Sequence, residues 1–239
     1  YSAVEGEVYA LSAFFTALVF WAALKWEQSV TEEEARGIRG HFTKADRWII
    51  LIFYLMGLSI GVHLFNLLTL PAIVLLYYFK RYKVTRWGTV FAFIIGCLIT
   101  GVVQIAVIQW SIKWAGNMDV FFVNSLGLPY FSGFGFLFLL LAAGIFFGIR
   151  MANKKNWNFL KLGMWSCAFM LVGYSSYLTT MIRSNADPSI DMFNVDNPVT
   201  LVGYVSREQY GDWPILYGQD FTAEVIDTKV SKTYIKADG

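Results

Sequence analysis

Residues 48–79 form a stretch of about 32 residues with no aspartate, glutamate, lysine or arginine. A single helix of that length would measure about 48 Å, well beyond a hydrocarbon core of about 30 Å. We therefore expect two shorter helices. The break should lie near His63, Asn66 and Pro71, because polar side chains and a proline mark a point where the chain turns at a membrane interface. The stretch is typical of a membrane protein.

Composition supports the same class. Of the 239 residues, 56% are hydrophobic and only 15% are charged, whereas soluble domains carry about 25% charged residues. The net charge of +2 gives no indication of a nucleic-acid partner. Cys97 and Cys167 lie in apolar runs and are expected to be packed or lipid-facing thiols. With His41 and His63 as the only imidazoles, no side chains have the spacing of a zinc site; His41 lies in a basic loop and is expected to be solvated.

The predicted fold is an all-α polytopic membrane protein with about six transmembrane helices. The predicted domains are a transmembrane core over residues 1–183 and a periplasmic tail over residues 184–239. Aromatic residues mixed with Asn, Gly and Pro over residues 111–132 predict an interfacial re-entrant or amphipathic segment. Turn-forming residues begin the tail, and the alternation in F-T-A-E-V-I-D-T-K-V then predicts the start of a small β-rich region. The expected spans are residues 8–26, two within 48–79, 87–109, 133–149 and 159–182.

Lysine and arginine collect in three short loops, which predicts that these loops face the cytoplasm. Six crossings then place both chain ends on the other face, together with Glu5, Glu7, His63 and the tail. The chemically capable residues are thus expected on the non-cytoplasmic side. The basic residues of the three loops are Lys25, Arg36, Arg39, Lys44 and Arg47; Lys80, Arg81, Lys83 and Arg86; and Arg150, Lys154, Lys155 and Lys161.

Glu5, Glu7 and His63 each have two interpretations. The two glutamates either begin a solvated helix and complement its dipole, or supply a carboxylate that orients a sugar or acts as base for an attacking hydroxyl. His63 follows Gly57 and Gly61, which allow close helix packing. It is therefore either a buried histidine bonded to a neighbouring helix or a residue of the site.

Two further candidates lie near the end of the core and in the tail. The sequence R-E-Q-Y-G-D at residues 207–212 is either a salt-bridged turn or a phosphate contact, because the arginine fork of donors suits a phosphate. Arg183 lies just beyond the last expected span. It is placed either to pair with a lipid phosphate or to extend its side chain to the interface.

Four segments in order resemble a large membrane family. They are S-A-V-E-G-E-V-Y-A-L-S, A-D-R-W-I-I-L-I-F-Y-L-M-G-L-S-I-G-V-H-L-F-N-L-L, F-F-V-N-S-L-G-L-P and G-Y-V-S-R-E-Q-Y-G-D. That family is abundant in Bacteroidetes and was long labelled a domain of unknown function. It is related to the transmembrane protein O-mannosyltransferases and looks like a branch of the type C glycosyltransferases. The resemblance extends over essentially the whole chain.

The resemblance implies a multi-pass enzyme of the bacterial inner membrane with its site on the periplasmic face. Such an enzyme transfers a sugar, mannose-like, from a polyprenyl-phosphate donor to a Ser or Thr hydroxyl of a secreted protein. Inverting chemistry of this kind needs a carboxylate base, and cations or helix dipoles around the leaving phosphate. The implied catalytic residues are Glu5, Glu7 and His63, and the implied substrate contacts are Asn66, Arg183, Arg207, Glu208, Tyr210 and Asp212.

The same resemblance gives expectations about a cofactor and about how much of the family protein this chain contains. A divalent cation is a possible cofactor, with Glu5 and Glu7 as its contacts, and membrane lipids are expected partners. In the family, the acidic motif that supplies the base lies in a loop after the first transmembrane helix, with a tryptophan, an aspartate and a glycine-glutamate pair. No such segment precedes Tyr1. We therefore expect this chain to resemble an internal part of the family protein and to be inactive alone.

The alternative is a non-catalytic subunit, either a membrane scaffold of an envelope secretion or motility complex or a lipid carrier. For an enzyme, Glu5, Glu7, His63 and Arg207 should converge on one cavity open to the outer leaflet. A scaffold would leave them dispersed and individually paired. A transporter is disfavoured because the expected spans show no inverted repeat.

Overall fold

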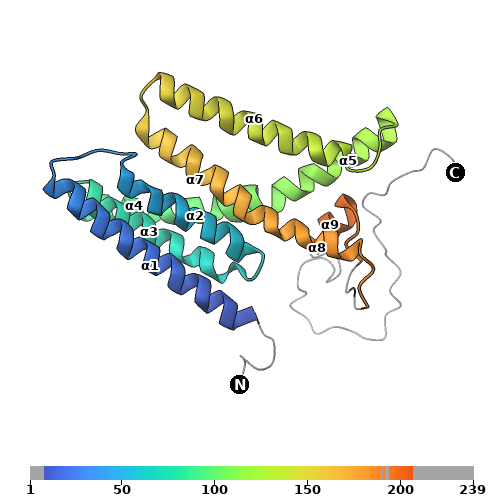
Figure 1. Cartoon of the computed structure of the whole chain (residues 1–239), viewed down its shortest axis with the longest axis horizontal. Helices are drawn as coiled ribbons and strands as arrows, with labels where there is room; N and C mark the ends of the chain where they lie inside the picture. Colours follow the sequence, from blue (N-terminus) through green and yellow to red (C-terminus); the bar gives the residue numbers. More distant parts are fainter. Residues whose placement is uncertain (1–7, 190, 192–193, 207–239) are drawn as a thin grey trace. The chain divides into compact units, whose positions relative to one another are not determined.

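The computed structural model describes residues 8–189, 191 and 194–206, and within them every regular element is a helix (Figure 1). The prediction of an all-α chain is confirmed for this part, whereas the predicted β-rich region lies outside it. The elements are α1 (Val8–Ala35), η1 (Lys44–Asp46), α2 (Arg47–Ile60), η2 (Leu64–Thr69), α3 (Leu70–Arg81), α4 (Arg86–Val102), the π-helical η3 (Val103–Trp110), α5 (Ser111–Leu126), α6 (Ser132–Lys154), α7 (Asn158–Tyr174), η4 (Ser175–Leu178), α8 (Thr179–Ser184) and α9 (Pro198–Val205).

Within the described residues, four helices are long and apolar enough to cross a membrane: Tyr9–Ala35, Leu64–Arg81, Arg86–Leu126 and Ser132–Lys154. Their faces expose large apolar side chains, as expected where the solvent is lipid. α2 and α7 have only 14 and 17 residues, less than the usual length of about 20. The expected number of six spans is therefore not confirmed. Both cysteines are free and exposed, in agreement with the prediction.

The break in the long apolar stretch lies where the sequence predicts it. α2 ends at Ile60, and His63 adopts an extended backbone (φ −163°, ψ 137°) before η2 begins. Pro71 lies in the first turn of α3, where its missing N–H would have no helical partner in any case. The stretch thus becomes two helical pieces that are joined by a short turn.

Residues 111–132 begin with a helix, which excludes the re-entrant form of the predicted interfacial segment. α4, η3 and α5 follow one another without interruption, so Arg86–Leu126 is a single helix. It ends at Gly127, whose φ of +65° is a left-handed conformation that glycine adopts easily. A re-entrant turn within residues 111–126 is therefore not found, because Gly116 and Asn117 are accommodated inside the helix and the chain turns only at Gly127. An amphipathic helix at the membrane interface stays a prediction.

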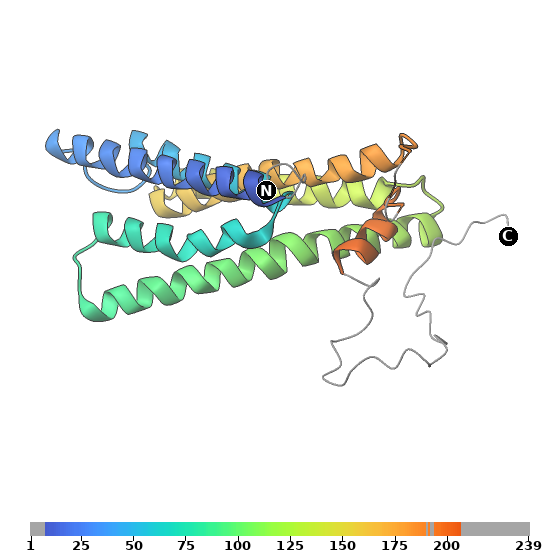
Figure 2. The same cartoon turned by 90° about the horizontal axis from the view of Figure 1, so that it is seen from below.

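The structure divides into two compact units, and the larger comprises residues 8–107 and 141–179. In this unit α2 packs directly on α7, beside α1 (Figure 1). The contact depends on glycine: a Cβ added to Gly57 would lie 2.2 Å from the Met170 carbonyl oxygen, and one added to Gly173 would lie 2.4 Å from that of Tyr54. α3 and α4 form a second close pair (Figure 2), with Gly96 against Pro71.

The smaller unit comprises residues 108–140 and 180–206. α9 packs on α5 at Gly116, where an added Cβ would meet Val202 at 2.5 Å. The sequence analysis does not predict α9, although asparagine is a preferred residue at a helix start. The Asn197 side-chain oxygen accepts hydrogen bonds from the N–H groups of Val199 and Thr200. Asp119 is fully buried and accepts hydrogen bonds from the backbone N–H groups around the start of α6; these donors are Phe131, Gly133 and Phe134, at 3.2, 3.0 and 3.3 Å.

We predict that Asp119→Ala loosens the start of α6. Without the carboxylate, three backbone donors lose an acceptor, and a hydrogen bond to a charged group contributes about 1.5–3 kcal/mol. Amide hydrogen exchange at Gly133 and Phe134 should accelerate by about tenfold or more. Asp187→Ala is the matched control, because Asp187 is exposed in the same unit. Equal exchange rates in the two variants would show that Asp119 does not hold this helix start.

Candidate functional site

The three basic loops lie at one end of the larger unit (Figures 1 and 2). An Arg81 Nη2 donates to the Thr43 hydroxyl at 2.9 Å, which joins the second loop to the first. The Lys161 amine lies 4.4 Å from the centre of the Phe42 ring, and the His41 ring meets that of Phe159, which joins the third loop to the first. The charge pattern of the sequence therefore corresponds to one physical end, called the basic end below.

A buried carboxylate organises the basic end. Asp46 is 1% exposed and accepts hydrogen bonds from Trp26 Nε1 at 3.0 Å, from Arg81 Nη2 at 3.1 Å and from the Thr43 N–H at 2.9 Å. The side chain of Arg81 is itself only 3% exposed. Glu33, also buried, accepts from the Ala45 N–H. Because these bonds join α1, η1 and α3, they fix the positions of three segments at this end.

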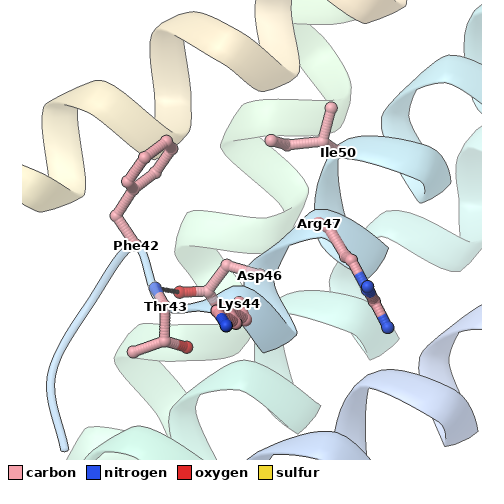
Figure 3. Close-up of a pocket in the computed structure, with 6 residues that line it drawn as sticks. All are labelled: Phe42, Thr43, Lys44, Asp46, Arg47 and Ile50. Carbon is pink, nitrogen blue, oxygen red and sulfur yellow. Dashed lines mark hydrogen bonds between the residues drawn. The ribbon is translucent and has the colours of Figure 1, made fainter.

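A pocket of about 200 Å³ opens beside this network (Figure 3). The charged ends of Lys44 and Arg47 lie on one side of the view, and the apolar side chains of Phe42 and Ile50 lie on the other. Lys44 and Arg47 are exposed. The lining residues are Phe42, Thr43, Lys44, Asp46, Arg47 and Ile50.

His41 is not the solvated side chain that the sequence predicts. Its ring stacks on Tyr77, with Nδ1 2.6 Å from the Tyr77 hydroxyl, and Nε2 lies 3.4 Å from the Tyr82 hydroxyl. It is half-buried among aromatic rings at the basic end. The correction arises because His41 lies 36 positions before Tyr77 and 41 before Tyr82, and Phe159 is more distant still, so this cluster depends on tertiary contacts.

His63 lies at the other end of α2, about 20 Å along the helix from Asp46. Its Nδ1 accepts a hydrogen bond from the Phe65 N–H at 3.1 Å. This bond requires an unprotonated Nδ1, so in the neutral ring Nε2 carries the proton and is the atom that donates. The ring is half-buried, 5.7 Å from the ring of Tyr9 on α1.

Asn66 holds the turn that carries His63. Its side chain is 0% exposed, and its amide nitrogen donates to the Ser59 hydroxyl at 3.1 Å. The Thr16 hydroxyl, from α1, lies 3.3 Å from the Asn66 oxygen. These bonds join the end of α2, the turn and α1. In this arrangement the Asn66 amide is directed to other helices of the protein, and His63 is the polar side chain at the edge of the break.

The remaining candidates are placed separately or lie outside the described residues. Arg183 is exposed near the end of α8, in the smaller unit. Residues outside the described part are Glu5, Glu7, Arg207, Glu208, Tyr210 and Asp212. In residues 8–189, 191 and 194–206, no three His, Cys, Asp or Glu side chains form a group that could hold a metal ion. The divalent cation expected at Glu5 and Glu7 stays a prediction.

Sequence reasoning missed the Asp46 network. The sequence indicates Arg81 only as a loop charge and Trp26 only as the end of a span. One local signal was available: T-K-A-D at residues 43–46 has the spacing of a capping box just before an apolar run. That signal identifies Asp46 as a helix-start residue, but its partners Trp26 and Arg81 are 20 and 35 positions away.

Residues 1–86 match the family model of the protein O-mannosyl-transferase TMEM260 N-terminal domain. This N-terminal part of the chain is therefore similar to the corresponding domain of that O-mannosyl-transferase. The matched segment includes α1, α2 and α3, and with them both the Asp46 network and the His63 turn. No curated protein and no solved structure matches the chain.

Proposed function

We propose that the protein is a membrane glycosyltransferase that transfers a mannose-like sugar from a polyprenyl-phosphate donor to a Ser or Thr hydroxyl of a secreted protein. The observation that carries the proposal is the match of residues 1–86 to an O-mannosyltransferase domain. Its reaction would take place on the periplasmic face of a bacterial inner membrane, at the end of α2 remote from the basic end. The positive-inside rule supports this orientation, because the three basic loops share the basic end.

The proposed reaction is an inverting displacement. The acceptor oxygen attacks the anomeric carbon, the bond from that carbon to the phosphate oxygen breaks, and the acceptor proton passes to a carboxylate base. Glu5 and Glu7 are the proposed carboxylates. His63 is proposed to donate its Nε2 hydrogen to the leaving phosphate, a role that fits the tautomer set by the Phe65 N–H. Asn66 is proposed to position that turn through Ser59 and Thr16.

Roles for the other candidates follow from the chemistry of phosphates and peptides. Arg183 and Arg207 are proposed to contact the donor phosphate, because the guanidinium group presents several donors to one anion. Glu208, Tyr210 and Asp212 are proposed to contact the acceptor.

The direct test is sugar transfer by the whole protein in lipid vesicles. The vesicles contain mannose linked to a polyprenyl phosphate, and a Ser/Thr peptide is added on the face opposite the basic end. Mass spectrometry of the peptide should show one added hexose per modified hydroxyl. If the folded protein binds neither donor nor peptide and transfers no sugar, the proposal fails and a scaffold role in an envelope complex takes its place.

We predict that His63→Ala lowers the transfer rate by about 100-fold, because removing one donor to a developing anion typically has an effect of that size. His63→Gln keeps an N–H donor and should recover part of the rate. Leu68→Ala is the control, since Leu68 is 65% exposed on η2, the segment that begins directly after His63. Equal rates for His63→Ala and Leu68→Ala would remove His63 from the site.

A further inference from the structure

The pocket in Figure 3 has a chemistry that the proposed reaction does not use. Among the residues that line it, Lys44 and Arg47 are cationic and Asp46 is the one carboxylate. Asp46 is already compensated, because the buried guanidinium of Arg81 pairs with it and Trp26 also donates to it. The two exposed cations therefore leave this pocket with a net positive charge, which favours an anion.

A third cation approaches from α7. The Lys161 amine lies over the Phe42 ring at 4.4 Å from its centre, and Phe42 is a wall of the pocket. Cations from η1 and α2 thus line the pocket, and a cation of α7 lies against the ring of one lining residue. Lysine and arginine from several helices around a small cavity at the cytoplasmic end of a helix bundle are typical of a site for anionic lipid headgroups.

The apolar side of the pocket distinguishes a lipid from a soluble anion. Phe42 and Ile50 both lie in the upper part of the view, above the charged ends of Lys44 and Arg47 (Figure 3). A phospholipid has the same division, with its phosphate beside its acylated glycerol, whereas inorganic phosphate has no apolar part to place there. The pocket also lies at the basic end, where α3, the last part of a candidate span, finishes at Arg81.

From this arrangement we infer that the pocket at the start of α2 binds the phosphate headgroup of an anionic phospholipid. Lys44 and Arg47 contact the phosphate, and Phe42 and Ile50 contact the upper part of the lipid chains. This site is separate from the His63 turn, so failure of the sugar-transfer proposal would not contradict it.

The test compares two double variants of the purified protein in detergent. Lys44→Gln with Arg47→Gln removes the pocket cations, and Arg36→Gln with Arg39→Gln removes two exposed cations of the same connection that do not line this pocket. Both lose the same charge. Native mass spectrometry during titration with phosphatidylglycerol gives the apparent Kd, with phosphatidylcholine as the zwitterionic comparison and inorganic phosphate as competitor.

We expect the pocket pair to raise the Kd for phosphatidylglycerol by about tenfold or more, since each charged hydrogen bond lost weakens binding substantially. The control pair should change it by less than about threefold. Equal losses in the two pairs would overturn the site, because bulk charge alone would then explain binding. Displacement of the lipid by equimolar inorganic phosphate would overturn the lipid assignment. Size-exclusion profiles equal to that of the unsubstituted protein confirm that both pairs are folded.

Discussion

Asp46→Ala should lower the free energy of unfolding of the larger unit by about 3–5 kcal/mol. The substitution leaves the Arg81 guanidinium buried, 3% exposed, without its carboxylate partner, and breaking a buried ion pair from one side typically has an effect of this size. Trp26 Nε1 and the Thr43 N–H lose their acceptor as well. The quantity to measure is the unfolding free energy in mixed micelles, followed by tryptophan fluorescence.

Two further variants make this prediction specific. Glu34→Ala removes an exposed carboxylate of α1 and should change stability by less than about 0.5 kcal/mol. Adding Arg81→Met to Asp46→Ala should recover part of the loss, because an apolar side chain of similar length needs no counterion. The ion pair would not be a support of the fold if Asp46→Ala and Glu34→Ala were equally stable.

Gly57→Ala should separate α2 from α7 and destabilise the larger unit by about 3 kcal/mol. The added Cβ would lie 2.2 Å from the Met170 carbonyl oxygen and 2.9 Å from the Tyr174 nitrogen. Both are backbone atoms, so the clash cannot be relieved by a side-chain rotation and one helix must move. Small residues at such crossings let helix backbones approach closely in membranes. Unfolding free energies in mixed micelles measure the effect.

Gly163→Ala is the matched control for Gly57→Ala. Gly163 lies in α7, and an added Cβ there would meet nothing within 4 Å. Alanine is a better helix former than glycine by about 1 kcal/mol, so this variant should be at least as stable as the unsubstituted protein. If Gly57→Ala behaved like Gly163→Ala, the close approach of α2 and α7 would not contribute to stability.

The division of the long apolar stretch could be predicted because its cause is local. A run without charges is too long for one span, and His63, Asn66 and Pro71 mark the turn. The conformation of residues 111–126 could not be predicted equally well. A segment rich in aromatic residues has the same composition whether it is an irregular interfacial loop or a helix. The continuity of α4, η3 and α5 shows that residues 111–126 are helical.

The candidate site shows the same limit. The sequence predicts that His63 and Asn66 lie at the break, but their roles differ through contacts made elsewhere. Ser59 and Thr16 bury the Asn66 amide, and the Phe65 N–H selects the tautomer of His63. The sequence contains all five residues but no indication of these pairings.

Membrane character and the grouping of basic loops were determined by the sequence alone, because hydropathy and charge act on each segment separately and depend little on its neighbours. Tertiary structure decided which polar groups inside the fold are paired. Asp46 meets Trp26 and Arg81, and Phe42 meets Lys161, only after helices distant in the sequence pack together. A buried charge is stable only beside its partner, and the packing of the helices determines which residue becomes that partner.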